Sequence, residues 1–563
     1  MLLALSTALA LSSPGAASVA IHGRDAPMLG LGSSAAPLVP LVPLHPWELG
    51  VFSCVLELDT ADFPEFGGNP AWLGRVGVHV LLRYMVAPPS DRGSGGGTSG
   101  GTSAAPEEVH VWGVVSAVPS LSTQQGKAAP KKPGASDPPH MDLDVQLRLT
   151  PVVQGAGGSS GSGGGGSGGS GSIGVPLEGV LKFPLGPIIQ SVLASPLRAR
   201  FTVPPGTAHE YVLSAMGGRP GRSCAFSPGE LTHALDARGM HVAPVDGTQQ
   251  APTSAAVVIK PLHSLNEAVV GMLLHHIEHH MMLGYDRYIV YIWPRSVSRF
   301  MALPPIAAWV RSGRLTVVVW SVLKETKSLP LYDQRVVYNH ACLAHVGMRT
   351  LLVMPDIDEF LVPLRPDLLS VFDVARECAP PHSVNFHLLR SNVIASHWPS
   401  AGAGGGGGAS GAAGGAGAAA GTVSTVSPLD RYSWVCHKYR PMYKTMADPN
   451  HIEVFSVHRA QTLPPHNSST VDPNCALLAH LPHIFAGTRA FTAVSRADFA
   501  EEQPWVDALA RLARQRAAWL AAGEGSAAVA LEAQRLGYYL PEYYAGWVTP
   551  PAAKRQGARK QGR

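Results

Sequence analysis

The stretch Thr350-Leu-Leu-Val-Met-Pro-Asp-Ile-Asp-Glu-Phe360 places a pair of carboxylates directly after a short apolar run. The run Leu351 to Met354 predicts a buried strand, which Pro355 ends. Asp356 and Asp358 are one residue apart, and in an extended segment the side chains of residues i and i+2 point to the same side. Ligands of open α/β sheets bind beyond the carboxyl ends of the strands, and paired oxygen ligands suit Mg²⁺ or Mn²⁺ that carries substrate phosphates. The stretch therefore predicts a metal–diphosphate site, and Glu359 is expected to help order it. An isolated D-x-D is more often a surface turn that caps the next helix.

The order of elements in front of this stretch favours the ligand site over the helix cap. Short apolar runs alternate with longer segments whose apolar residues recur at helical spacing, such as Val269, Leu273, Ile277 and Met281. Such alternation predicts an α/β domain with a mostly parallel sheet, right-handed crossovers and helices on both faces. The predicted strands are residues 256–260, 287–292, 315–320 and 351–354, and the predicted helices lie within residues 266–282, 298–311 and 331–346.

The remainder of the chain divides by composition. Residues 21–250 hold Val- and Leu-rich runs between Gly/Ser/Pro-rich inserts and predict a β-rich accessory domain, either a carbohydrate-binding sandwich or a purely structural domain. The α/β domain is assigned to residues 255–500, with a disordered Gly/Ala insert at 401–421. Residues 1–20 predict a signal peptide or weak signal anchor, residues 501–548 predict C-terminal helices, and residues 549–563 predict a basic disordered tail.

Composition limits the classes of function. The chain has 563 residues, 15% of them charged, and a net charge of +4, so no nucleic-acid partner is expected. Its six cysteines form no C-x-x-C pair, which argues against a structural zinc site. Apolar runs long enough to cross a bilayer are not found, so at most weak membrane anchoring at the N-terminus is expected. Together with the sequon Asn467-Ser468-Ser469, the apolar N-terminus indicates a secretory protein.

A series of motifs in a fixed order resembles glycosyltransferase family 92, and related family-2-like transferases share part of the series. The motifs are V-I-K-P-L-H-S-L-N-E from Val258, I-E-H-H-M-M-L-G-Y-D-R-Y-I-V-Y from Ile277, D-Q-R-V-V-Y-N-H-A-C-L from Asp333, D-I-D-E-F-L from Asp356, and the segment from Lys444 to His458. The resemblance implies an A-type glycosyltransferase fold. It also implies that a hexose, typically galactose, moves with inversion from a uridine-diphosphate sugar to a glycan or glycoprotein acceptor. The expected location is the Golgi lumen or Golgi membrane, or outside the cell after secretion.

The resemblance further implies roles for individual residues. Mn²⁺ or Mg²⁺ would be held by Asp356, Asp358 and His458, and would act as a Lewis acid on the leaving diphosphate. Contacts to the nucleotide sugar are expected at Asn266, Glu267, Gln334, Asn339, Asp356 and Lys444. A carboxylate should also deprotonate the acceptor hydroxyl as general base, and three candidates remain open, namely Asp430, Glu453 and Asp472.

Three alternative interpretations bear on these expectations. The run His275-His276-Ile277-Glu278-His279-His280 suggests a metal site, but at about 100° per residue its histidines fall on different sides of a helix, so structural histidines are expected. The D-x-D also resembles the D-x-D-x-T/V start of haloacid-dehalogenase phosphatases, from which Phe360 departs. The segment Trp293-Pro294-Arg295-Ser296 departs from the acidic or Asn/Ser-rich loop of the family, which leaves a non-catalytic carbohydrate-binding protein on the same fold as an alternative.

Overall fold

The computed structural model describes the chain in segments. Asn266 and the predicted signal segment, Gly/Ala insert and basic tail lie outside these segments. The described residues are 43–45, 49, 51–59, 75–86, 107–116, 141–153, 172–173, 177–185, 199–203, 210–215, 223–227, 252–262, 265, 267–320, 330–394, 427–432, 434–436, 442–455, 457–481 and 499–522.

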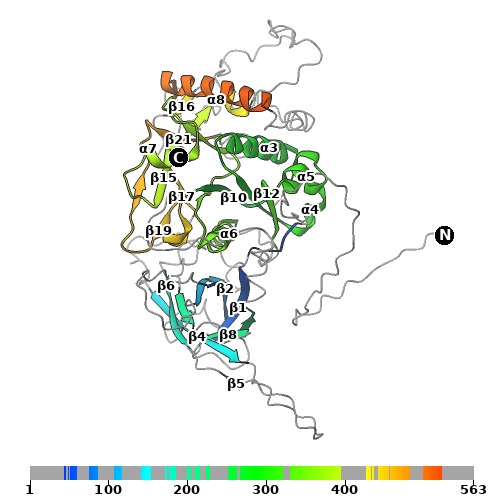
Figure 1. Cartoon of the computed structure of the whole chain (residues 1–563), viewed down its shortest axis with the longest axis vertical. Helices are drawn as coiled ribbons and strands as arrows, with labels where there is room; N and C mark the ends of the chain where they lie inside the picture. Colours follow the sequence, from blue (N-terminus) through cyan, green and yellow to red (C-terminus); the bar gives the residue numbers. More distant parts are fainter. Residues whose placement is uncertain are drawn as a thin grey trace, which may run out of the picture. The chain divides into compact units, whose positions relative to one another are not determined.

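A mixed sheet forms the centre of the α/β region (Figure 1). Its first half consists of β12 (Leu315–Val319), β11 (Arg287–Ile292), β10 (Ser254–Leu262) and β13 (Thr350–Val353), which are parallel neighbours in that order. The chain adds β11 and β12 on one side of β10 and then places β13 on the other side. Such a reversal of strand order is the point at which open α/β sheets bind ligands beyond their carboxyl ends. The four strands lie where the sequence predicts them, to within two residues.

Helices cover both faces of this parallel half, with α3 and α6 on opposite sides of the sheet (Figure 1). Side chains of β10 alternate between two cores, since Val257 packs with α3 and Val258 packs with α6. The sequence predicts a helix within residues 298–311 that Pro304-Pro305 interrupts. Two helices form there, because Pro304 lacks an amide hydrogen and stands at the first turn of a new helix. The helices are α3 (Glu267–Met282), α4 (Pro294–Met301), α5 (Pro304–Arg311) and α6 (Pro330–His345).

The second half of the sheet is largely antiparallel, which differs from the mostly parallel sheet that the sequence predicts. β17 (Met442–Ala447) is antiparallel to β13, and β15 (Asn385–Ile394) is antiparallel to β17. β14 (Glu359–Pro363) leaves the D-x-D motif and pairs with β21 (Ala476–His480). The other elements of this half are α7 (Val371–Glu377), η6 (Pro428–Arg431), β16 (Trp434–Cys436), η7 (Pro449–His451), β18 (Ile452–Phe455), β19 (Ala460–Thr462), β20 (Ser468–Thr470), β22 (Phe499–Glu501) and α8 (Gln503–Ala521).

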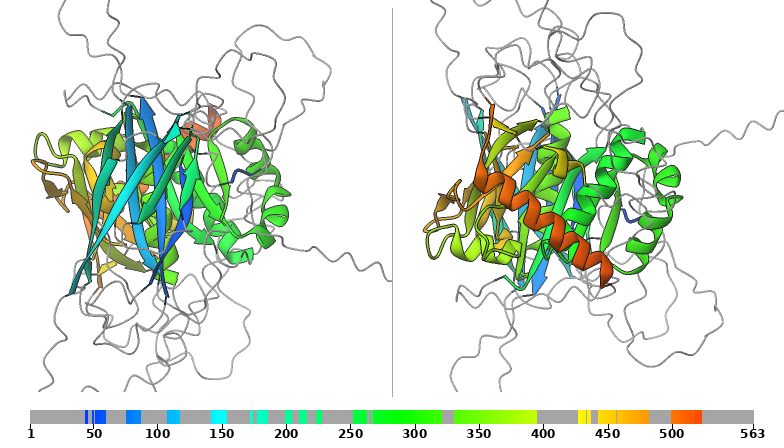
Figure 2. Two further views of the ribbon diagram at one scale, coloured as in Figure 1. Left: turned by 90° about the horizontal axis from the view of Figure 1, so that it is seen from below. Right: turned by 90° about the horizontal axis from the view of Figure 1, so that it is seen from above.

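Two contacts hold the C-terminal elements against this sheet. Helix α8 crosses one face diagonally (Figure 2, right), and its buried Trp505 donates from Nε1 to the carbonyl of Tyr432 at 2.7 Å. A disulfide joins Cys378, at the end of α7, to Cys475, directly before β21. Among the described residues, no helix is long and apolar enough to span a membrane.

The N-terminal part contains two further sheets, and every strand pairing in its described residues is antiparallel. One sheet has the order β1-β2-β3-β7, and in the other β4 pairs with β5, β6 and β8, and β8 with β9. The strands are β1 (Phe52–Asp59), β2 (Arg75–Val86), β3 (Glu107–Ser116), β4 (Met141–Val153), β5 (Ser172–Ile173), β6 (Leu177–Leu185), β7 (Ala199–Val203), β8 (Glu210–Ala215) and β9 (Cys224–Phe226).

Candidate active site

The D-x-D motif forms a turn at the carboxyl end of β13. The Glu359 amide donates to the Asp356 carbonyl at 2.9 Å and closes the turn, and the Asp356 amide donates to Glu359 Oε2 at 2.7 Å. The prediction of an extended segment with both carboxylates on one side is therefore wrong, because the turn directs Asp356 and Asp358 to different partners. The expectation that Glu359 orders the site is confirmed, since its carboxylate fixes the backbone of the turn.

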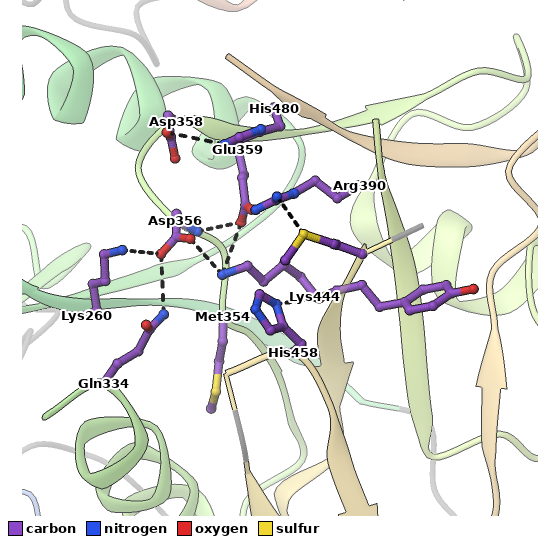
Figure 3. A network of polar contacts seen from close by, with 12 residues as sticks. Lys260, Gln334, Met354, Asp356, Asp358, Glu359, Arg390, Lys444, His458 and His480 are labelled. Carbon is purple, nitrogen blue, oxygen red and sulfur yellow. Dashed lines mark hydrogen bonds and ion pairs between the residues drawn. The ribbon is translucent and has the colours of Figure 1, made fainter. Parts of the chain in front are cut away.

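Asp356 lies between two lysines (Figure 3). Lys260 Nζ is 2.7 Å from Oδ1, Lys444 Nζ is 2.8 Å from Oδ2, and Gln334 Nε2 donates to Oδ1 at 3.3 Å. Burial alone would raise the pKa of Asp356, but the two ammonium groups outweigh it and hold that pKa well below its ordinary value. Asp356 is therefore a carboxylate at neutral pH, with both of its oxygens engaged by cations.

Strand register explains why these three charges meet. Val257 of β10 pairs with Val353 of β13, and Lys260 and Asp356 each follow three residues later, so they remain neighbours beyond the paired segment. Val353 also pairs with β17, which runs in the opposite direction and brings Lys444 to the other side of the same turn. The carboxyl ends of β10 and β13 thus meet the start of β17 at the point where strand order reverses.

Glu359 extends this network into the protein interior. Its Oε1 accepts from Arg390 Nη1 at 3.1 Å, and its Oε2 lies 3.4 Å from Lys444 Nζ. Burial would lower the pKa of Lys444, but Asp356 and Glu359 together raise it above its ordinary value. The exposed fraction of the side chain falls from 37% at Lys260 through 16% at Asp356 to 0% at Lys444. The Lys260 end of the network therefore faces solvent, whereas Lys444, expected as a contact to the nucleotide sugar, is sealed behind Asp356.

Asp358 faces the end of β21. Its Oδ2 lies 3.5 Å from His480 Nε2, and the Leu481 amide donates to its carbonyl at 2.9 Å. Burial would raise the pKa of Asp358, but His480 outweighs this effect and lowers the pKa below its ordinary value. The second carboxylate of the motif is therefore also ionised, and its near partner is an imidazole.

Helix α6 connects the D-x-D turn to the strand that leads to His458. Gln334 reaches Asp356, and it also donates to the hydroxyl of Tyr338 at 2.6 Å. Asn339 bonds the backbone of Phe455 in both directions, through Nδ2 to the carbonyl and from the amide to Oδ1, each at 2.8 Å. Helix α6 thus positions two parts of the site, and Asn339 has a structural contact where a nucleotide contact was expected.

His458 is half-buried beside Lys444 (Figure 3). Its Nδ1 donates to the carbonyl of Tyr443 at 3.2 Å, which leaves Nε2 as the acceptor nitrogen of the ring. Burial and then the charge of Lys444 lower the pKa of His458, so the imidazole is neutral at pH 7. A neutral imidazole with an available lone pair is able to bind a metal or accept a proton.

The histidines of α3 are structural, as the sequence predicts, and they support the strand that follows the D-x-D. His276 Nε2 donates to the carbonyl of Glu359 and His279 Nε2 to the carbonyl of Leu361, each at 2.8 Å. These are alternate carbonyls of β14, so the two side chains bond that strand as a neighbouring strand would. Burial lowers the pKa of His276 to about 3 and that of His279 to about 4, which keeps both rings neutral.

The three candidate bases lie in different surroundings. Asp430 accepts from the amide of Ser427 at 3.0 Å within a capping box and pairs with Arg516 of α8. Asp472 is exposed before β21, whose first residue pairs with the end of β14 remote from the D-x-D turn. Asp430 therefore stabilises local structure, and Asp472 lies far from the D-x-D turn, so neither is well placed to act as the base. Glu453 is half-buried on β18, the strand that leads to His458, and it is the candidate that we retain.

The donor set fits a divalent cation at Asp358 and not at Asp356. In the segments that the structure describes, no three His, Cys, Asp or Glu side chains converge on one point, so the expected set of Asp356, Asp358 and His458 is not assembled. A cation at Asp356 would meet two ammonium groups. Asp358 and His480, whose Oδ2 and Nε2 are 3.5 Å apart, would be the residues to hold such a cation. Mg²⁺ commonly takes one or two carboxylates and completes its shell with water and substrate phosphates, so two protein ligands suffice.

Sequence reasoning missed three residues of the site, namely Lys260, Arg390 and His480. Lys260 carries a local signal, because it is a cation at the end of an apolar strand. Arg390 and His480 reach the site through the pairings of β15 with β17 and of β21 with β14, which no local pattern indicates. The side chain of Glu267 lies outside the described residues, so its expected contact has no structural counterpart.

Comparison with known proteins identifies the region that carries this site. Residues 254–505 match the model of Glycosyltransferase family 92. None of the curated proteins compared with the chain matches it significantly. The match begins at the first residue of β10 and ends in α8, so it contains the mixed sheet, the D-x-D turn and both lysines. The chain therefore carries a glycosyltransferase family 92 domain and is a glycosyltransferase.

Proposed function

We propose that the chain moves a hexose, and galactose first among the candidates, from a uridine-diphosphate sugar to a hydroxyl group of a glycan or glycoprotein. One observation carries this proposal: within the family 92 domain, charged side chains meet at the carboxyl ends of β10 and β13, where the strand order reverses. Nucleotide ligands bind at such points in open α/β sheets. The A-type fold remains part of the proposal, supported by the parallel half of the sheet and the D-x-D turn after β13.

A divalent cation, Mn²⁺ or Mg²⁺, belongs to this proposal. Asp358 would hold it, together with His480 once that imidazole is neutral, and water and donor phosphates would complete its shell. A bound cation would supply Lewis-acid stabilisation of the charge that develops on the leaving diphosphate. The lowered pKa of Asp358 makes this carboxylate ready to bind a cation at neutral pH.

Transfer with inversion requires a base on the acceptor side. The bond from the anomeric carbon to the diphosphate breaks, the acceptor oxygen bonds to the opposite face of that carbon, and the hydroxyl proton passes to the base. We assign this role to Glu453, because it is half-buried on β18. The two hydrogen bonds between Asn339 and Phe455 fix that strand to α6, which also carries Gln334 into the site.

Two features support a location in the secretory pathway. The disulfide between Cys378 and Cys475 forms in oxidising compartments and is rare in the cytosol. Asn467 of the sequon is exposed directly before β20, where an attached glycan would meet solvent. We therefore propose a location in the Golgi lumen, and a shift in mass of the chain after endoglycosidase treatment would test its passage through the secretory pathway.

A donor screen tests the activity. The purified full chain is incubated with a panel of glycan acceptors and several uridine- and guanosine-diphosphate sugars, with Mn²⁺ or with a chelator, and released nucleoside diphosphate is measured. We expect release from one uridine-diphosphate sugar with Mn²⁺ alone, and a product whose anomeric configuration, read by NMR, is opposite to that of the donor. Equal release of nucleoside diphosphate in the presence of the chelator would contradict a requirement for a divalent cation.

Matched variants separate catalysis from simple binding. Asp358→Asn should abolish release, whereas Asp472→Asn, which alters an exposed carboxylate at the far end of β21, should leave it unchanged. Binding of a uridine-diphosphate sugar without turnover in any combination of donor and acceptor would favour the non-catalytic carbohydrate-binding protein.

A further inference from the structure

Two ammonium groups share the carboxylate of Asp356. Lys260 and Lys444 both pair with Asp356, and Lys444 and Arg390 both pair with Glu359. Asp358, the second carboxylate of the motif, faces His480, and Lys260 contributes to its lowered pKa. Asp356 therefore keeps one cation when the other lysine leaves it.

The cations of this network are accessible at only one end. Lys444 is fully buried and Arg390 nearly so, at 0% and 10% exposure of the side chain, whereas Lys260 is 37% exposed. Burial and the charge of Lys444 act to lower the pKa of Lys260, but Asp356 outweighs them and raises it, so Lys260 carries a positive charge. An incoming anion would therefore meet Lys260 first.

Position determines which anion fits. Lys260 stands at the carboxyl end of β10, beside the D-x-D turn and on the edge where the strand order reverses. This edge is where α/β sheets place the phosphates of a nucleotide. An ammonium group on a flexible stem is a point charge able to exchange one oxygen partner for another without a fixed geometry.

We propose that Lys260 binds the diphosphate of the donor, by exchanging Asp356 for a phosphate oxygen. Lys444 remains on Asp356 and Glu359 throughout, so Asp356 is a positioning residue that holds both ammonium groups ready and is not a ligand of the metal. The identity of the ligand as a nucleotide diphosphate rests on the proposed function. The role of Lys260 as the anion contact rests on its exposure and on its place at the carboxyl end of β10.

A purely structural ion pair is the competing account, and stability distinguishes the two. If Lys260 served only to neutralise Asp356, its removal would destabilise the fold. Without Lys260, Lys444 still pairs with Asp356, and Lys444 and Arg390 still pair with Glu359, so both carboxylates keep a cation. Lys260→Met, which keeps the apolar stem, should therefore unfold at about the same temperature as the wild type.

The binding experiment uses pyrophosphate, UDP and UMP as probes in isothermal titration calorimetry of the full chain, with and without Mn²⁺. We expect Lys260→Met to weaken the binding of pyrophosphate and UDP by roughly ten- to a hundred-fold, the range of one hydrogen bond to a charged group, and to change UMP binding less. Lys260→Arg should recover most of the loss. Mn²⁺ affinity should be unchanged in both variants, because Asp358 and His480 are intact.

A matched control removes another cation from an ion pair at the surface. Arg365 pairs with Asp367 in the exposed segment after β14, so Arg365→Met should bind all three probes as the wild type does. Wild-type affinity of Lys260→Met for pyrophosphate would overturn the inference and leave the proposed function intact. Lowered stability of Lys260→Met, with binding and stability both restored in Lys260→Arg, would also overturn it. A wild type that binds neither pyrophosphate nor UDP would contradict the proposed donor class itself.

Discussion

The two halves of the central sheet contribute to the site in different ways. The parallel half supplies Lys260 and Asp356 from the ends of adjacent strands, at the point where its strand order reverses. The antiparallel half supplies Lys444, Arg390 and His480 from three strands that return to the same edge after long excursions of the chain. The parallel half therefore supplies the exposed end of the network, and the antiparallel half supplies the buried cations behind it. The following predictions test this division in decreasing order of the expected effect on folding stability.

The strongest test removes the carboxylate that joins the two halves. Glu359 is fully buried. Its carboxylate forms ion pairs with Arg390 and Lys444 and accepts a hydrogen bond from the Asp356 amide. Glu359→Gln would leave three cations opposite a single carboxylate, and we expect the free energy of unfolding to fall by about 3–5 kcal/mol, the usual loss when one partner of a buried ion pair is removed. Urea denaturation followed by circular dichroism measures this change.

A double variant examines the reason for that loss. Glu359→Gln combined with Arg390→Met removes one anion together with one cation, so it should recover a large part of the stability that the single variant loses. Additive losses from the two changes would show that Arg390 and Glu359 are not coupled.

The same division explains what could be predicted from the sequence. Apolar runs and helical spacing locate the four parallel strands to within two residues, because each of these signals is local. The D-x-D was assigned to an extended segment, but the return of the Glu359 carboxylate to the Asp356 amide makes it a turn. Arg390 and His480 could not be found, because their places depend on strand pairings between residues far apart in the chain. Family resemblance pointed to Gln334, which reaches Asp356, and to His458, which lies beside Lys444 (Figure 3), but it could not show that Lys444 is sealed.

A second test loosens the antiparallel half alone. The disulfide between Cys378 and Cys475 closes a loop with a sequence separation of 97 and lies directly before β21. Cys378→Ser should lower the free energy of unfolding by about 2–4 kcal/mol, because the unfolded chain regains the freedom of that loop. Hydrogen exchange should increase in β21 before it increases in β10. Uniform exchange across both halves would contradict the view that they are separately supported.

A third test uses pH, because α3 of the parallel half bonds β14 through neutral histidines. The folded pKa values of His276, about 3, and His279, about 4, lie below the ordinary value of 6.5. Below pH 6.5 the unfolded chain binds protons that the folded chain does not, so their contribution to stability is complete above pH 6.5 and is lost as the pH falls towards 4 and 3. Between pH 7.5 and 5.5 we expect a loss of about 1 kcal/mol for each histidine, measured by urea denaturation.

A variant that cannot titrate provides the control for this pH dependence. His279→Gln keeps an N–H group for the carbonyl of Leu361 but carries no ring that gains a proton in the unfolded chain. Its stability should therefore fall less steeply with decreasing pH than that of the wild type. An identical slope in the variant and the wild type would assign the pH dependence to other groups.

The smallest expected effect on stability separates the two aspartates of the D-x-D. Asp358 is partly exposed and lies 3.5 Å from a single imidazole, so Asp358→Asn should change the free energy of unfolding by less than about 1 kcal/mol. Asp356→Asn leaves Lys260 and Lys444 facing each other without a carboxylate between them, and it should destabilise the fold by more. Mn²⁺ affinity, measured by electron paramagnetic resonance, should behave in the opposite way, with loss in Asp358→Asn and retention in folded Asp356→Asn. If both variants lost Mn²⁺ equally, the two carboxylates would share the cation, and Lys260 and Lys444 would have to leave Asp356 when it binds.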